Sequence, residues 1–365
     1  MSKTLGPGPA FGASVALVLA ISAPAGAGEK DTFPNISGEI VIEIQNDLAY
    51  DSDDPTAEFN TLFTATEPSA TIRFTEEISV FTGLVLEPVK APAVSGDDQV
   101  FDNQGLFVEV LTLNYDSGRF SLFGGKFGPN FGIAWDAAPG IYGRDLPEGY
   151  ELAERIGFGG SVNFGDDTLG RHTLSASTFF LDTSGLAESV ITRRDKPRQA
   201  DGGPGNTGDL SSFAVGLDGG GFKALPGFRY HLSYVHQGNG LDTEQDEKGF
   251  AVGAEYELGI TDDIGARPLI EYVNQTDADG VDDQDRFYLT GALALTYGNW
   301  NLTLAGTRKE TEAADGTETN EEQFQVSAGY AFDNGIGFDL GWMTNRNAGV
   351  DTDTFGTWLT YAYEF

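Results

Sequence analysis

Cysteine is absent from this chain of 365 residues. No disulfide can therefore form, and no cysteine is available to carry a lipid anchor behind an export signal. Histidine is also scarce (3), and no cluster of cysteine and histidine has the spacing of a metal site. We therefore expect no cofactor and no metal.

Basic residues are few as well. The chain has 21 lysines and arginines against 56 aspartates and glutamates, which gives a formal charge of −35 at pH 7. Proteins that bind nucleic acid need a basic surface, so this balance excludes nucleic acid as a partner.

Long apolar runs are almost missing. One run extends from Ala10 to Ala23 and is followed by small residues up to Ala27, which predicts a signal peptide over residues 1–27, cut after Ala25 or Ala27. The run is too short to cross a bilayer as a helix, and no later run approaches the roughly twenty apolar residues required. The mature chain, residues 28–365, is predicted to have no membrane-spanning helix.

Instead of long apolar runs, the chain has apolar and polar residues that alternate with a period of two. Residues Phe324 to Phe332 alternate in this way, the turn Asp333-Asn334-Gly335 follows, and a second alternating segment runs from Ile336 to Trp342. Glycine (49), phenylalanine (26) and tyrosine (13) are abundant, as in barrels with tight turns and aromatic girdles. The pattern predicts antiparallel hairpins.

Sixteen such segments can be delimited. They are residues 36–46, 57–74, 78–89, 105–115, 119–127, 151–164, 171–182, 210–218, 228–237, 248–258, 265–275, 286–297, 300–309, 322–332, 336–345 and 353–365. Short turns alternate with longer polar connections, such as Lys309 to Glu321 and Asn347 to Thr352. This predicts an all-β fold, a transmembrane antiparallel β-barrel of about 16 strands in one domain, with short periplasmic turns, long extracellular loops and an aqueous lumen.

The second segment contains a change of parity. Phe59, Phe63 and Ala65 occupy odd positions, whereas Ile72 and Phe74 occupy even ones. We interpret Pro68 as a β-bulge that moves the apolar stripe from one parity to the other, because one inserted residue would explain the switch.

The last segment carries an aromatic stripe that ends on the final residue. Phe355, Leu359, Tyr361, Tyr363 and Phe365 share one face, which is predicted to meet lipid. This ending resembles the assembly signal of bacterial outer-membrane β-barrels. The resemblance implies an integral protein of the Gram-negative outer membrane, with lipid, lipopolysaccharide and the barrel assembly machinery as partners.

The third long connection, about residues 128–149, mixes aromatic and apolar residues with prolines and glycines, which indicates a packed loop. The chain resembles the general porins, in which the third loop folds into the barrel and narrows the pore. The resemblance implies a homotrimer that passes small hydrophilic solutes by passive diffusion. It would place Asp136, Asp145 and Glu148 in the lumen, with Arg144 and Arg155 nearby.

Basic side chains opposite such a loop would need inward positions, and the parity of Arg73, Arg119, Arg229 and Arg267 fits. The inward carboxylates Glu39, Glu43, Glu255, Glu257 and Glu271 outnumber them, so we expect a preference for cations. Alternatively, the acidity keeps the outer loops solvated and bridged to lipopolysaccharide by divalent cations.

Two alternatives to a general pore remain open. Glu58-Phe59-Asn60, Glu67-Pro68-Ser69-Ala70 and Leu84 to Val89 resemble the opening strands of a porin group proposed to carry siderophores, which implies a substrate-selective channel. A structural or adhesive surface barrel is the second alternative.

Two further groups of residues carry side chains that can bind metal or act in catalysis. The aspartates between Asp277 and Asp285 could bind calcium, but no glutamate closes a twelve-residue calcium loop, so a solvated loop is favoured. His231 and Ser233 share a face, but a hydrolase would also need an acid placed by the fold. We expect no enzyme activity and no catalytic residue.

Overall fold

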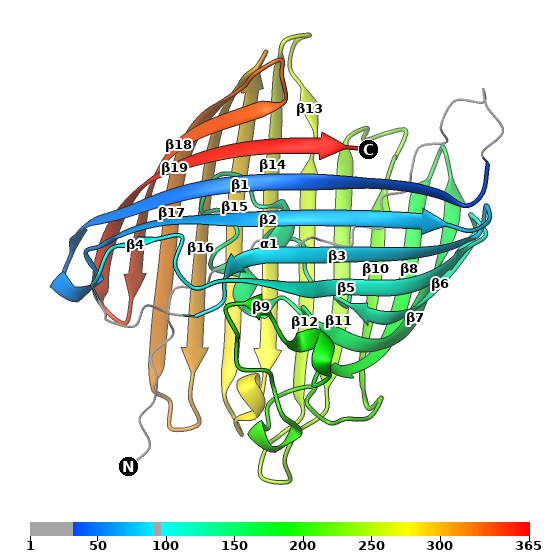
Figure 1. The fold of residues 1–365 in the computed structure, drawn as a ribbon, viewed down its shortest axis with the longest axis horizontal. Coiled ribbons are helices and arrows are strands. Elements are labelled where there is room, and N and C mark those ends of the chain that lie inside the picture. Colours follow the sequence, from blue (N-terminus) through cyan, green and yellow to red (C-terminus); the bar gives the residue numbers. More distant parts are fainter. Residues whose placement is uncertain (1–31, 91–95) are drawn as a thin grey trace.

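The computed structural model describes residues 32–90 and 96–365. The predicted signal peptide, residues 1–27, lies outside the described residues. Sixteen long antiparallel strands make up most of this part of the chain (Figure 1). They are β1 (Asn35–Ser52), β2 (Asn60–Arg73), β3 (Ile78–Pro88), β5 (Gln104–Asp116), β6 (Phe120–Phe127), β7 (Arg155–Asp166), β8 (Gly170–Leu181), β10 (Ser212–Gly220), β11 (Phe228–Gln237), β12 (Glu247–Tyr256), β14 (Ile264–Thr276), β15 (Asp285–Tyr297), β16 (Trp300–Glu312), β17 (Glu318–Ala331), β18 (Ile336–Asn347) and β19 (Val350–Glu364).

The remaining elements are short and lie in connections. They are the strands β4 (Gln99–Val100), β9 (Val190–Ile191) and β13 (Leu258–Gly259), the helix α1 (Ala134–Ala137), and the 3₁₀ helices η1 (Pro55–Ala57), η2 (Pro147–Tyr150), η3 (Gly185–Ala187), η4 (Gln199–Asp201) and η5 (Ala278–Gly280). No helix in residues 32–90 and 96–365 is long and apolar enough to span a bilayer.

The sheet closes on itself. Each long strand pairs with its neighbours in sequence, and β1 pairs with β19, for example Ile40 with Tyr363 and Ile44 with Leu359. Gly38 and Phe365 continue this ladder, each donating its N–H to the carbonyl of the other at 2.9 Å. Each of the sixteen predicted segments overlaps one long strand, so the predicted all-β barrel is confirmed.

Two predicted connections are shorter than expected. β16 continues to Glu312 and β17 already begins at Glu318. Only residues 348–349 separate β18 from β19. Polar residues continue these ladders, and Lys309 pairs with Glu321 at 3.1 Å. Composition alone suggested loops here because paired strand ends in water carry the same polar residues as loops.

The interpretation of Pro68 as a bulge is wrong. The ladder between β1 and β2 runs through Pro68 without a shift of register. A shift of register does occur between β3 and β5, where Gly83 pairs with Val110 but Leu84 pairs with Val108, leaving Glu109 as the extra residue. The odd-numbered Phe63 and Ala65 are buried and line the interior, so they do not form a lipid-facing stripe.

The outer wall carries large apolar side chains. In β19, Phe355, Leu359, Tyr361 and Tyr363 are exposed, whereas Thr354 and Gly356, on either side of Phe355, are buried. This is the alternation predicted for the last strand. A role of this strand in assembly stays a prediction.

Candidate functional site

The connection between β6 and β7, residues 128–154, is called the third loop here. Its backbone and side chains contact inward-facing residues of strands on several sides of the barrel. Asn130 donates to Asp218 on β10 at 3.0 Å, Gly132 donates to Ser233 on β11 at 3.2 Å, and Ile141 donates to Ser327 on β17 at 3.3 Å. The loop therefore crosses the barrel interior.

Glu271 on β14 is the main anchor of one half of the loop. Its carboxylate accepts hydrogen bonds from the N–H groups of Ile133 at 2.6 Å and Ala134 at 2.8 Å, and from the hydroxyl of Tyr150. The first N–H groups of a helical turn have no partner within the helix, and α1 has no capping side chain of its own. A buried carboxylate from the wall supplies the missing acceptor.

The other half of the loop is held by β1 and β17. Tyr142 donates to Asp47 at 2.7 Å, Gln325 donates to the carbonyl of Pro139 at 3.0 Å, and Gln323 donates to the carbonyl of Tyr142. Gly140 has a φ of +96°, and a Cβ there would collide with Gln325 and Thr303. Only glycine fits this close approach of the loop to the wall.

Aromatic packing adds to these polar anchors. Phe131 and Tyr150 stack edge to face at 6.3 Å between ring centres, and Tyr150 and Tyr288 do so at 5.0 Å. These rings belong to a buried cluster that includes Phe127 and Phe179 from the wall. The apolar residues that distinguish this loop in the sequence therefore pack against the inside of the barrel.

The C-terminal end of the loop enters a buried ionic cluster formed by Lys126, Glu154, Asp182 and Arg194. The Lys126 ammonium is fully buried and lies 2.7 Å from Glu154 and 2.9 Å from Asp182. Arg194 donates a hydrogen bond from each terminal nitrogen to the Glu154 carboxylate, at 2.7 and 2.5 Å, and its guanidinium lies 3.7 Å above the ring of Phe107. The cluster ties the third loop to the connection between β8 and β10.

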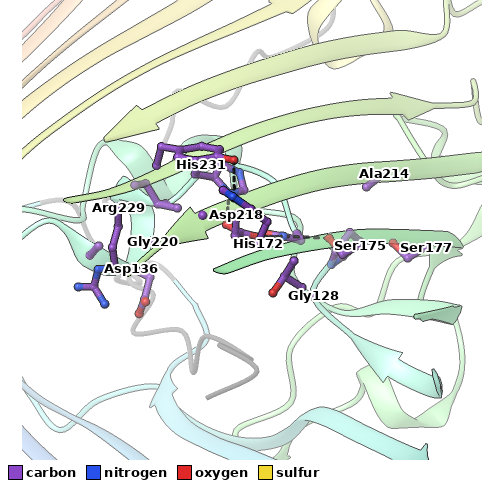
Figure 2. A pocket seen from close by; sticks show the side chains of 18 of the residues that line it. Gly128, Asp136, His172, Ser175, Ser177, Ala214, Asp218, Gly220, Arg229 and His231 are labelled. Carbon is purple, nitrogen blue, oxygen red and sulfur yellow. Dashed lines mark hydrogen bonds and ion pairs between the residues drawn. The ribbon is translucent and has the colours of Figure 1, made fainter. Parts of the chain in front are cut away.

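Two cavities border the third loop. The large cavity, about 1040 Å³, is lined by Asp136 of the loop and by Asp218, Arg229, His231 and Arg267 of the wall (Figure 2). The small cavity, about 340 Å³, lies between the loop and β1, β2, β3, β18 and β19. Its charged lining consists of Glu43, Asp47, Glu87, Arg144, Asp145 and Glu148.

The four arginines of the predicted basic wall lie in different places. Arg229 and Arg267 both pair with Glu255, at 2.8 and 3.4 Å, and Arg267 also donates to the loop carbonyl of Ala137 at 3.4 Å. Arg73 ends β2 and Arg119 precedes β6, at the end of these strands opposite the third loop. Parity predicts which face a side chain occupies but not its height along the barrel, and neither Arg73 nor Arg119 lines either of the two cavities.

The residues predicted to lie in the lumen at the third loop are found in different places. Asp136 lines the large cavity, and Arg144, Asp145 and Glu148 line the small one. Arg155 begins β7 and lines neither cavity, because it donates to the carbonyl of Ala153 at 3.0 Å and to Gln237 at 3.3 Å.

Burial raises the pKa of the three loop carboxyls Asp136, Asp145 and Glu148. For Asp145, burial and the nearby Asp47 carboxylate together raise the pKa to about 7. The charge of the loop therefore depends on pH near neutrality.

Sequence reasoning identified Glu43 as an inward carboxylate but missed three others on the neighbouring strands. Glu43, Glu67, Glu87 and Glu109 lie on β1, β2, β3 and β5, and we call them the acidic wall. Glu43 and Glu87 line the small cavity and Glu109 lines the large one. Glu67 shares the inward parity of Phe63 and Ala65 in the unbroken ladder. Without a bulge at Pro68, alternation gives Glu67 the same inward parity as Arg73.

His231 and Ser233 do have an acid beside them. Nδ1 of His231 lies 2.7 Å from Asp218 and Nε2 lies 2.8 Å from the hydroxyl of Ser233. That hydroxyl also accepts the N–H of Gly132, and His231 and Ser233 are 1% and 8% exposed. The chain of hydrogen bonds thus holds the loop to the wall, because the hydroxyl is buried and engaged rather than free to attack a substrate.

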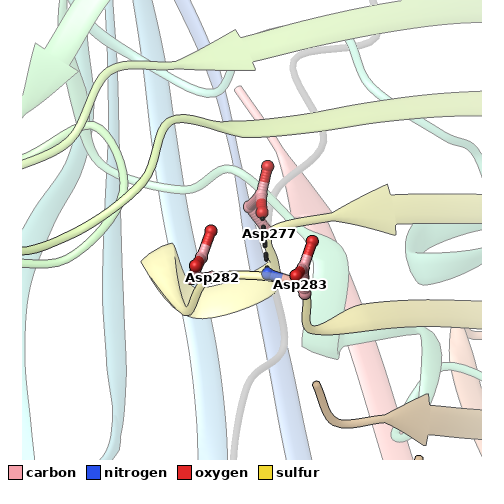
Figure 3. A group of neighbouring side chains, drawn as sticks. All are labelled: Asp277, Asp282 and Asp283. Carbon is pink, nitrogen blue, oxygen red and sulfur yellow. Dashed lines mark hydrogen bonds between the residues drawn. The ribbon is translucent and has the colours of Figure 1, made fainter. Parts of the chain in front are cut away.

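The aspartates after β14 form a cluster on the connection to β15 (Figure 3). One carboxylate oxygen each of Asp277, Asp282 and Asp283 lies within 4.8 Å of the others, the only such group of three or more in the described residues. Asp279, by contrast, pairs with Arg286 at 2.5 Å. Two of the three aspartates are exposed, and a solvated loop stays our prediction.

The sequence matches no protein-family model and no curated protein. Solved structures of bacterial outer-membrane channels have the same fold. The channel DcaP of Acinetobacter baumannii is similar over 90% of this chain and 96% of its own, with 13% identity and a TM-score of 0.59. OpdK of Pseudomonas aeruginosa, solved with vanillate, is similar over 91% and 99%, with 10% identity and a TM-score of 0.54.

A third similar structure is the trimer form of OmpT, an outer-membrane protein of Vibrio cholerae. It covers 90% of this chain and 98% of its own, with 11% identity and a TM-score of 0.53. At these identities the likeness concerns the fold. The chain has the porin-like fold of a closed sixteen-stranded barrel.

Proposed function

We propose that this protein is an integral outer-membrane channel through which small hydrophilic solutes diffuse down their gradients. The observation that carries the proposal is a closed sixteen-stranded barrel with an apolar outer wall and a loop across its interior. Cavities with charged linings border that loop. The proposal includes the third loop as the narrowest part of the path and a homotrimer, as in the trimer form of OmpT.

Cation preference is part of the proposal. The formal charge of −35 and the five carboxylates of the small cavity, against one arginine, would concentrate cations along the path. Lipid, lipopolysaccharide and the assembly machinery are the proposed partners of the outer wall.

A substrate-selective channel is the second candidate. It is favoured by the large cavity, whose volume of about 1040 Å³ and mixed polar and aromatic lining would suit one bound organic solute.

Conductance across planar bilayers tests the function. A stable ohmic current with a reversal potential on the cation side supports the proposed channel, and a protein that inserts but never conducts would falsify it. Block of the current by a micromolar organic solute would favour the selective channel.

Lowering the pH through about 7 is expected to weaken cation preference, because the carboxyl of Asp145 then becomes protonated and neutral. The reversal potential in a salt gradient, measured over this pH range, reports the change. Asp145→Asn should flatten the pH dependence. Asp315→Asn is the matched control, since hydrogen bonds from Thr317 lower the pKa of that exposed loop carboxyl. Equal pH dependence in the two variants would contradict the assignment to Asp145.

A further inference from the structure

The acidic wall occupies one side of the interior, and each of its four members comes from a different neighbouring strand. The register places Glu43 beside Ala65 of β2, and Glu67 beside Val41 of β1. Glu87 lies beside Gly105 of β5, and Glu109 is the bulge residue of that strand. Because adjacent strands lie about 4.8 Å apart, the carboxylates are spread along the wall rather than gathered at one point.

Arg144 is the one basic side chain that lines the small cavity in the described part of the chain. It projects from the third loop, between Gly143 and Asp145. The charges that act on it are those of Glu43 and Glu67 on the wall and of Glu148 and Asp136 on the loop. The guanidinium is permanently charged, so it offsets part of the negative field of the wall at any working pH.

The loop holds Arg144 in this place. Tyr142 is bonded to Asp47 and to Gln323, and Gln325 holds Pro139, so the backbone on the N-terminal side of Arg144 is fixed to β1 and β17. On the other side Glu148 donates its N–H to the carbonyl of Arg144 at 2.9 Å. The cation is therefore attached to a packed segment and cannot diffuse away.

We propose that Arg144 is a tethered counter-ion that sets the selectivity of the channel between cations of different charge. Its positive charge offsets the negative field that the acidic wall would otherwise present to a permeating dication. The inference rests on the proposed channel function. Without Arg144, the wall would retain cations that carry two separated positive charges.

The spacing of the wall carboxylates predicts which kind of dication the wall would bind without Arg144. In the described residues, the only His, Cys, Asp or Glu group close enough to surround one metal ion is Asp277, Asp282 and Asp283, outside the small cavity. Carboxylates on separate strands instead match a linear diamine, whose two ammonium groups can each reach one of them. The probe is accordingly 1,4-diaminobutane, which carries both charges at neutral pH.

The test compares Arg144→Gln with Arg119→Gln, which removes the same charge from the opposite end of the barrel. Arg144→Gln is expected to move the reversal potential further toward the cation side. It should also lower the concentration of 1,4-diaminobutane that halves the current by about tenfold or more, the effect of about 1.4 kcal/mol in binding. Arg119→Gln should behave as the unmodified protein, and Arg144→Lys should retain the original selectivity.

Two further results keep the proposal open to refutation. Adding Glu43→Gln to Arg144→Gln should weaken diamine block again, and Glu43→Gln alone should reduce cation preference even if Arg144→Gln fails to fold. Identical block and reversal potential in Arg144→Gln and Arg119→Gln would overturn the role of Arg144. An unmodified protein that inserts without conducting would instead refute the channel function itself, so the two failures are distinguishable.

Discussion

Glu271→Ala is expected to increase the current through single channels and to make it noisier. The substitution removes the acceptor of three hydrogen bonds that hold Ile133, Ala134 and Tyr150 of the third loop to β14. A hydrogen bond to a charged group contributes about 1.5–3 kcal/mol, so the loss of three is enough to let this half of the loop leave the wall.

Single-channel recording measures the effect, and deletion of residues 133–146 gives its upper limit. The deletion should raise the conductance several-fold if the third loop narrows the path. Glu257→Ala is the matched control, because Glu257 lies between β12 and β13 and is exposed. Current and noise equal to the control would show that the contacts of Glu271 do not restrain the loop.

Lys126→Met is expected to destabilise the barrel by about 3–5 kcal/mol, because removing one partner leaves buried charges without compensation. Asp182, whose side chain is as completely buried as that of Lys126, loses its counter-charge, and Glu154 keeps only Arg194. The change should also loosen the connection between β8 and β10, since Lys126 donates to the carbonyl of Leu186 at 3.0 Å.

Urea unfolding in detergent or lipid, followed by tryptophan fluorescence, measures this loss. Arg171→Gln is the control, because Arg171 and Asp167 form an ion pair that is 73% and 88% exposed and contributes little. Lys126→Met and Asp182→Asn together should be less damaging than Lys126→Met alone. A single variant as stable as Arg171→Gln would mean that water or relaxation compensates the buried carboxylates.

The strands could be predicted because each has one apolar face and one polar face, and because closure requires an even number of them. The segments from Phe324 to Trp342 show why: alternation locates both strands, and Asp333-Asn334-Gly335 locates the turn. Strand ends were less predictable, since the paired residues Lys309 and Glu321 are as polar as any loop.

The candidate site could be predicted only in part. The composition of residues 128–149 indicated a packed loop, but not that Glu271, Asp47 and Gln325 would hold it. Those contacts join the loop to strands that are distant in sequence, and the alternation of residues within a single strand does not predict them. Glu67 of the acidic wall was missed because Phe63, which shares its parity, was assigned to lipid, whereas Phe63 lines the small cavity beside the loop.

Every pair of neighbouring long strands is joined directly by the chain except β1 and β19, which meet only through their ladder. Contacts between such distant segments form slowly, because the intervening chain must first be ordered. Until β1 and β19 pair, the sheet has two unpaired edges that can add strands from other chains. The hazard of aggregation during folding is therefore concentrated at the edges of β1 and β19, and it ends once these two strands have paired.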